Sequence, residues 1–212
     1  ICGAIRITRA YGERNVYFLY CTETVGARSS RPVFGKKLAG RPRPYRIIMS
    51  FDEKYFSSHT YANITFAKYS MYWWSNRFYA ILARRYGKRG SRFLEVGSGM
   101  GHLTGQLEDT FETFGCDLNH WAVKQSKAVV DKSSLQTASA QELPFRNDSF
   151  NVVIIKHIVE HLPDPQKAIN EIGRVTEKGG TLILATPNLD SLLKPWKGDK
   201  WIGYQDPTHI SL

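Results

Sequence analysis

A glycine-rich turn, together with a carboxylate that follows it, could bind a nucleotide. The turn carries glycines at alternate positions, in the order Glu95-x-Gly97-x-Gly99-x-Gly101. Because glycine has no Cβ atom, the backbone there can bend sharply and approach a ligand closely. Asp117 lies 20 positions after Gly97, where a carboxylate can accept hydrogen bonds from ribose hydroxyls. A dinucleotide fingerprint would need glycine in place of His102, and a phosphate loop would need Gly-Lys-Ser/Thr, so the pattern is neither.

These residues need a parallel sheet to bring them together. The apolar run Phe93–Val96 predicts a buried strand, and a helix is expected over His102–Glu108. Later strands are predicted at Phe111–Asp117, Leu135–Ala138, Phe150–Ile155 and Thr181–Ala185, with helices over Asn119–Val130 and Asp164–Val175. This alternation predicts an α/β, Rossmann-like, doubly wound and mostly parallel sheet with helices on both faces. Ligands bind beyond the carboxyl ends of such strands, where Glu95, Asp117, His157 and Thr186 fall.

The stretch that precedes the sheet is aromatic and helical in its spacing. Tyr72, Asn76 and Tyr79 recur at helical intervals, and Gly87 ends the pattern. Aromatic residues cluster within Tyr69–Tyr79, which could form a base-stacking box or a cap that packs on the core. We favour the packed cap, because aromatic stripes usually bury their area.

The charge of the chain is concentrated at its start. The net charge is +10, of which residues 1–48 supply +8 and residues 49–212 only +2. Nucleic acid is therefore not the expected partner; the alternative is that residues 1–48 bind it. We expect no membrane partner, since no run approaches the roughly 18 apolar residues of a spanning helix. The scattered Cys2, Cys21 and Cys116 suggest reduced thiols in a cytoplasmic protein.

The most characteristic stretch is residues 138–165, which read Ala-Ser-Ala-Gln-Glu-Leu-Pro-Phe, then a buried strand, then His-Ile-Val-Glu-His-Leu-Pro-Asp-Pro. Together with the glycine turn, it resembles the small-molecule, ubiquinone-pathway-like branch of the class I S-adenosylmethionine (SAM) dependent methyltransferases. The resemblance covers roughly residues 55–209. It implies an enzyme that transfers a methyl group from SAM to a small molecule, with O-methylation favoured.

The resemblance also implies which residues would bind the cofactor. Ser139 stands where the family usually has an Asp that contacts the adenine amine, and Lys156 and His157 stand where the methionine part of SAM is contacted. The full predicted cofactor set is Glu95, Gly97, Ser98, Gly99, Gly101, Asp117, Leu118, Ser139, Ala140, Gln141, Lys156 and His157. His209 and His157 are the candidate general bases for a hydroxyl acceptor, although His209 could equally be a plain loop residue.

His157, Glu160 and His161 also spell the zinc motif H-x-x-E-H. A protease is excluded because the motif follows a buried strand of a nucleotide-binding sheet. Related O-methyltransferases look as though they bind a divalent ion at Glu-x-x-Glu-His, where His157 here replaces the first Glu. We predict no metal; the alternative is an ion at Glu160 and His161.

Residues 1–48 form a basic segment with Arg-Pro repeats, before a helical cap over residues 49–90 and a SAM-binding core over residues 91–212. Ile1-Cys2-Gly3 and Cys21 resemble parts of a zinc ribbon, but Thr24 replaces a ligand and structural zinc needs four. A degenerate ribbon and an unrelated extension both stay open. Val16–Cys21 could be a strand.

The resemblance implies further strands beyond Leu212, so we expect the chain to be incomplete. Without those strands the apolar strand Thr181–Ala185 would leave a sheet edge exposed, and we expect the chain to self-associate through it.

Two other functions remain open. One is a nucleic-acid methyltransferase, although Lys156-His-Ile-Val159 replaces the Asp/Asn-Pro-Pro-Tyr/Phe motif of amine-directed enzymes, and Cys116 lies away from the nucleophile position of carbon-5 enzymes. The other is a SAM-binding module without catalysis. The acceptor and the oligomeric state cannot be predicted from the sequence.

Overall fold

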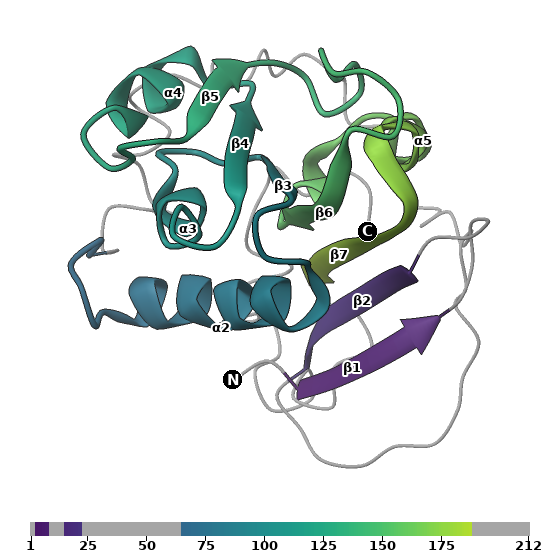
Figure 1. Cartoon of the computed structure of the whole chain (residues 1–212), viewed down its shortest axis with the longest axis horizontal. Coiled ribbons are helices and arrows are strands. Elements are labelled where there is room, and N and C mark those ends of the chain that lie inside the picture. Colours follow the sequence, from purple (N-terminus) through teal and green to yellow (C-terminus); the bar gives the residue numbers. More distant parts are fainter. Residues whose placement is uncertain (1–2, 9–14, 23–64, 188–212) are drawn as a thin grey trace, which may run out of the picture.

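The computed structural model describes residues 3–8, 15–22 and 65–187, which build one seven-stranded sheet with helices packed against it (Figure 1). The strand order is β1-β2-β7-β6-β3-β4-β5. The strands are β1 (Gly3–Thr8), β2 (Asn15–Thr22), β3 (Arg92–Val96), β4 (Glu112–Asp117), β5 (Ser134–Thr137), β6 (Phe150–Lys156) and β7 (Thr176–Pro187). The helices are α2 (Met71–Tyr86), α3 (His102–Gly105), α4 (His120–Ser126), α5 (Pro165–Val175) and the 3₁₀ turn η1 (Val159–His161).

Strands β5, β4, β3, β6 and β7 are all parallel, which confirms the predicted doubly wound sheet. From β3 the chain builds outward through β4 and β5, and it then returns to the other side of β3 for β6 and β7. The topological switch point therefore lies between β3 and β6, where Val96 pairs with Ile155. A ligand is expected just beyond the carboxyl ends of these two strands.

Both faces of the central strands are buried, as their continuous apolar runs predict. Val152 and Ile154 of β6 pack in one cluster with Tyr79 and Ala83 of α2. Val153 and Ile155 pack in a second cluster with α5 residues on the opposite face. The alternation of side chains along β6 thus sends successive residues to opposite layers.

The caps of the helices follow the sequence, whereas two helices are shorter than predicted. Asn119 caps α4 and Asp164 caps α5, as expected. However, α3 ends at Gly105 and α4 ends at Ser126. Beyond each end the backbone N–H groups bond to the carbonyl three residues back, as in Gln106 to Leu103, so the helices tighten into turns.

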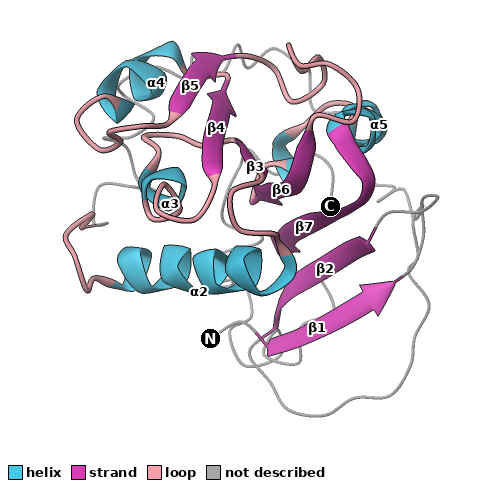
Figure 2. Cartoon of the chain, in the orientation of Figure 1, coloured by secondary structure: helices cyan, strands magenta, loops and turns pink. Residues whose placement is uncertain are grey.

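The predicted exposed edge beside Thr181–Ala185 is wrong. Strand β2 pairs in parallel with β7, from Asn15 opposite Thr181 to Cys21 opposite Pro187, and β1 pairs antiparallel with β2 (Figure 2). The β7 edge is thus covered by β2. Self-association was predicted because this edge would have unpaired backbone groups, and that reason does not apply. The first 22 residues therefore contribute two strands to the same sheet as the core.

Several predicted features lie outside the described residues. These are His209 and the loop around it, the Arg-Pro repeats, Cys2, Thr24 and the part of the cap before residue 65. Among the described residues, no helix has both the length and the apolar composition that crossing a bilayer requires.

Candidate functional site

The loop after β3 is shaped by its glycines. Gly97, Gly99 and Gly101 have φ values of 77°, 52° and 79°, a region that side-chain-bearing residues rarely adopt. The N–H groups of Gly97 and Ser98 both donate to the carbonyl of Cys116 in β4, at 2.8 and 3.0 Å. A Cβ atom on Gly97 would lie 2.3 Å from Cγ1 of Ile158. The loop is therefore held in place by β4 and by the loop that follows β6.

Asp117 completes this arrangement from the end of β4. Its Oδ2 accepts the Gly99 N–H at 2.7 Å, and its Oδ1 accepts the Asn119 N–H at 2.8 Å. Burial raises the pKa of the Asp117 carboxyl, and the two backbone donors oppose that rise. A carboxylate has about four lone-pair sites. These two bonds use two of them, so the Asp117 carboxylate can still accept two hydroxyls.

Glu95 and Lys156 form a buried ion pair at the switch point. Glu95 is 1% exposed, and its Oε1 lies 3.4 Å from Nζ of Lys156 at the end of β6. The other oxygen of Glu95 accepts from the N–H and the hydroxyl of Thr104, at 3.1 and 2.6 Å. Burial raises the pKa of Glu95, while Lys156 and Thr104 lower it. Lys156 also donates to Oδ1 of Asn76, which ties α2 to the site.

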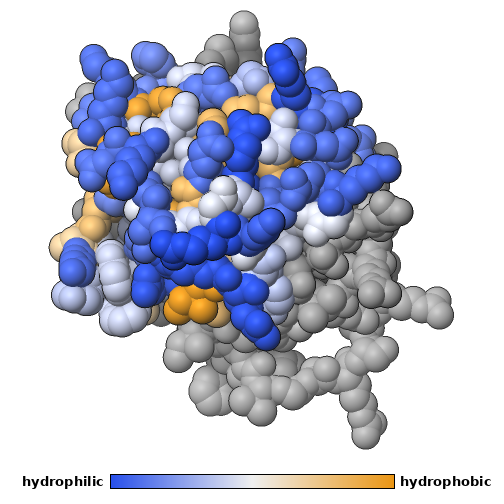
Figure 3. Space-filling view, viewed as in Figure 1, coloured by the Kyte–Doolittle hydropathy of each residue, from blue (hydrophilic) through white to orange (hydrophobic). Residues whose placement is uncertain are grey.

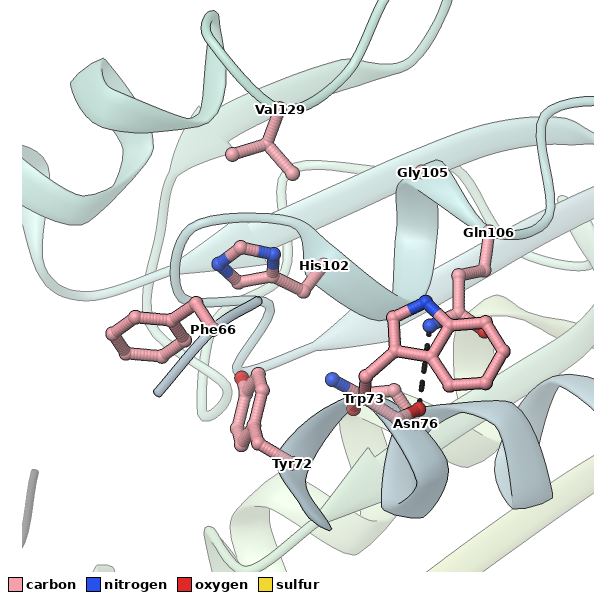
Figure 4. A pocket seen from close by; sticks show the side chains of 8 residues that line it. All are labelled: Phe66, Tyr72, Trp73, Asn76, His102, Gly105, Gln106 and Val129. Carbon is pink, nitrogen blue, oxygen red and sulfur yellow. Dashed lines mark hydrogen bonds between the residues drawn. The ribbon is translucent and has the colours of Figure 1, made fainter. Parts of the chain in front are cut away.

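An aromatic cavity of about 190 Å³ lies between α2 and α3 (Figure 4). Its lining residues are Phe66, Tyr72, Trp73, Asn76, His102, Gly105, Gln106 and Val129. The Phe66 and His102 rings are stacked, with centroids 5.0 Å apart, and Tyr72 stands edge-on to both. Drug-sized ligands occupy pockets of roughly 300–1,000 Å³. The cavity can therefore hold only part of such a ligand.

The cavity adjoins the predicted cofactor residues without containing any of them. Nζ of Lys156 is 5.9 Å from the centre of the Tyr72 ring, and it bonds to Asn76. Burial, with a further contribution from Glu95, raises the pKa of Tyr72 to about 12, so its hydroxyl remains protonated at neutral pH. From the sequence, Tyr72 and Asn76 were placed on one helix face of a packed cap, and the resemblance implied that this region covers the SAM site and helps define the acceptor pocket; neither residue was given a role of its own. Sequence reasoning did not identify Phe66, His102 or Gln106, which become neighbours only through the fold.

The loop after β6 holds His157 in a strained conformation. The φ of His157 is 54°, and its N–H donates to the Ala185 carbonyl at 2.8 Å. Its Nδ1 lies 3.5 Å from Oε1 of the buried Glu160, whose Oε2 accepts from Thr186 at 3.3 Å. Glu160 therefore links this loop to the end of β7. Within the described parts of the chain, no group of three or more His, Cys, Asp or Glu side chains could hold a metal ion.

The remaining predicted cofactor residues lie beyond β4 and β5. The Ala138 N–H donates to the Asp117 carbonyl at 3.0 Å, which brings the next three residues beside Asp117. Ser139 accepts from the Gln141 N–H at 3.1 Å, and Ala140 is buried. The Leu118 side chain is 57% exposed beside this segment. The sheet thus gathers all twelve predicted cofactor residues at the carboxyl ends of neighbouring strands.

Comparison with known proteins shows what this part of the chain resembles. Residues 94–184, which contain β3 to β7 and the loops described above, match the sequence profile of the family described as "Methyltransferase domain". Residues 94–184 are therefore similar to methyltransferase domains. The resemblance that the ordered motifs predicted is therefore confirmed for this part of the chain.

The relatives of this methyltransferase domain have different acceptors. A phosphatidylethanolamine N-methyltransferase of Cereibacter sphaeroides is 28% identical over 45% of this chain and 50% of its own length. A chloroplastic tocopherol O-methyltransferase of Arabidopsis thaliana is 28% identical over 66% of this chain and 43% of its own length. The chain thus spans about half the length of the curated relatives it matches.

Solved structures agree on the fold. The YcgJ protein of Bacillus subtilis superposes with a TM-score of 0.52 at 23% identity, over 65% of this chain and 61% of that one. At this identity the similarity establishes the Rossmann-like architecture of the domain.

Proposed function

We propose that this protein transfers the methyl group of SAM to a small-molecule acceptor, and that oxygen is the favoured acceptor atom. One observation carries the proposal. The glycine loop, the Asp117 carboxylate and the Glu95–Lys156 pair converge beyond the carboxyl ends of β3, β4 and β6, at the switch point of the sheet. A methyl transfer needs chiefly that donor and acceptor be aligned and water be excluded, which such a fixed frame can provide.

The residues present fit SAM. Asp117 has two lone-pair sites left for the ribose hydroxyls, and Ser139, Ala140 and Gln141 with Leu118 would border the adenine. Glu95 and Lys156 offer one charge of each sign to the amino and carboxylate groups of the methionine part. Oγ of Ser98 is buried without a hydrogen-bond partner within the described residues, and such an atom favours a polar ligand. SAM, when bound, supplies a methyl group on a positively charged sulfur.

The acceptor would enter from the aromatic side. The cavity lined by Phe66, Tyr72 and Trp73 suits the apolar body of a small molecule. His157, whose ring is exposed and whose Nδ1 faces Glu160, would accept the proton of a hydroxyl acceptor. His209 remains the second predicted base. The two relatives are named for different acceptor atoms, nitrogen and oxygen, so the acceptor atom of this protein is to be determined by experiment.

Cys116 does not favour the carbon-5 alternative. Burial raises the pKa of its thiol to about 12, and the Asp117 charge adds to that rise. A nucleophilic cysteine needs the opposite environment, one that lowers its pKa and exposes it.

We propose that residues 91–212 carry the SAM site and that residues 49–90 cap it. Of residues 1–48, β1 and β2 belong to the sheet of the core, and the remainder would be a basic segment.

Asp117→Ala is expected to weaken SAM binding by about 1–3 kcal/mol, because a charged acceptor of two hydroxyls and of the Gly99 N–H is removed. Isothermal titration calorimetry of the 212-residue chain with SAM measures this loss. Glu112→Ala, at the opposite end of the same strand, is the matched control and should bind SAM normally. Equal affinities for SAM in the two variants would refute the assignment of Asp117.

A further inference from the structure

An apolar face of α2 points away from the sheet. Met71, Trp74 and Ile81 are 83%, 53% and 54% exposed, although such side chains usually bury their area. Their spacing of three and seven residues places them on one side of the helix, opposite the buried Tyr79 and Ala83. We call Met71, Trp74, Arg77, Ile81 and Arg85 the outer face of α2. In Figure 3 an apolar patch interrupts the hydrophilic surface over the part of the molecule where Figure 1 draws α2.

The surroundings of this face are positively charged. Residues 65–89 contain six basic side chains and no acidic one. Arg84 is neutralised by Asp109, at 3.0 Å. Arg77 and the exposed Arg85 share the face with Trp74 and Ile81, and Lys68 stands over the Tyr69 ring. Basic groups beside an exposed tryptophan and aliphatic side chains are typical of helices that lie in a membrane interface.

We propose that the outer face of α2 docks this protein on an anionic lipid surface. There Trp74, Met71 and Ile81 would enter the acyl boundary, while Arg77 and Arg85 would contact lipid phosphates. Surface docking needs no spanning helix, so the predicted absence of a membrane partner, which rested on the lack of a long apolar run, does not extend to it.

Two other occupants fit the face less well. Nucleic acid would pair with the arginines and stack on Trp74, but Met71 and Ile81 can neither stack on bases nor hydrogen-bond to them. A second copy of the chain would bring two like faces together around a two-fold axis. That contact would set Arg77 and Arg85 near their own copies with no acidic partner in residues 65–89, and like charges in an interface are costly.

Docking would also place the aromatic cavity at the lipid surface. Phe66, Tyr72 and Trp73 line the cavity, while Met71 and Trp74, their neighbours in sequence, face outward. An amphiphilic acceptor could then pass from the bilayer into the site. This consequence rests on the proposed function, whereas the docking itself does not.

Cosedimentation of the 212-residue chain with vesicles tests the proposal. We expect binding to phosphatidylcholine vesicles that contain phosphatidylserine, weaker binding to phosphatidylcholine alone, and release by salt. Trp74→Ser with Ile81→Ser should weaken vesicle binding by about tenfold or more, since two apolar side chains no longer enter the bilayer. Because both side chains are exposed, this variant should fold, and unchanged SAM affinity would confirm it.

A charge-matched pair of variants separates docking from simple attraction. Lys68→Ser, Arg77→Ser and Arg85→Ser together should weaken vesicle binding about tenfold. The same number of changes at Lys124, Lys127 and Lys132, in and after α4, should alter it less than about twofold. The proposal would be overturned by equal losses in both triple variants or by no vesicle binding at all. It would also be overturned by RNA binding through the same residues without vesicle binding, or by a dimer that dissociates in the Trp74→Ser variant. SAM affinity is a separate readout, so failure here is distinguishable from failure of the proposed function.

Discussion

Lys156→Met is expected to lower the free energy of unfolding by about 3–5 kcal/mol, because it leaves the Glu95 carboxylate buried without its counter-charge. Methionine keeps most of the aliphatic length of lysine, so the loss would report the charge rather than a cavity. The variant also removes the bond from Nζ to Asn76, which ties α2 to the sheet. Urea denaturation followed by circular dichroism measures the change.

The effect should depend on pH in a defined direction. The pKa of Glu95 is raised above its ordinary value of 4.5 in the folded protein, so its carboxyl favours folding at low pH and loses this contribution as the pH rises above 4.5. Without Lys156 that pKa rises further, because an opposing charge is gone. The deficit of Lys156→Met relative to the unsubstituted protein should therefore grow from acidic to neutral pH.

Two further variants isolate the pair. In Glu95→Gln with Lys156→Met no charge remains buried, and the amide oxygen can still accept from Thr104, so most of the stability should return. Lys178→Met removes an exposed lysine and should change stability by less than about 0.5 kcal/mol. If Lys156→Met were as stable as Lys178→Met at neutral pH, the buried pair would not support the site.

Gly97→Ala is expected to abolish measurable SAM binding while the sheet stays folded. The new Cβ would lie 2.3 and 2.4 Å from two side-chain atoms of Ile158, so the Ile158 side chain, the glycine loop or the loop after β6 must shift. The φ of 77° adds strain of about 1–2 kcal/mol for a residue with a Cβ atom. Calorimetry with SAM and a thermal melt together separate lost binding from lost fold.

Gly90 supplies the matched control for this variant. Its φ of 79° equals that of Gly97 within a few degrees, but a Cβ there would meet nothing within 4 Å. Gly90→Ala should therefore lose stability through strain alone and bind SAM normally. Adding Ile158→Ala to Gly97→Ala removes both clashing atoms and should restore part of the binding. Normal SAM affinity in Gly97→Ala itself would show that the loop is only a structural turn.

The sequence predicted those parts of the site that depend on local pattern. The glycine spacing, the position of Asp117 and the apolar runs of β3 and β6 are readable along the chain, because each is set within one strand and its following turn. Parallel strands bring their carboxyl ends to one edge of the sheet. The predicted cofactor residues therefore lie together in the structure, because the strand order β6-β3-β4-β5 sets their strands side by side.

Pairing between distant segments could not be predicted in the same way. Val16–Cys21 was a candidate strand, but nothing in its own residues specifies β7 as the neighbour, since backbone pairing is available to any strand at an open edge. The Glu95–Lys156 pair needed the order β3–β6, and the aromatic cavity needed His102 to stack on Phe66. The short α3 and α4 helices reflect turns that helical propensity alone does not reveal.

A crystal structure of the 212-residue chain grown with S-adenosylhomocysteine tests the central claim most directly. The account predicts the ribose hydroxyls against Asp117, the adenine beside Ser139–Gln141, and the amino-acid end of the ligand near Glu95 and Lys156. Ligand bound elsewhere, or no ligand at saturating concentration in crystals that diffract well, would contradict it.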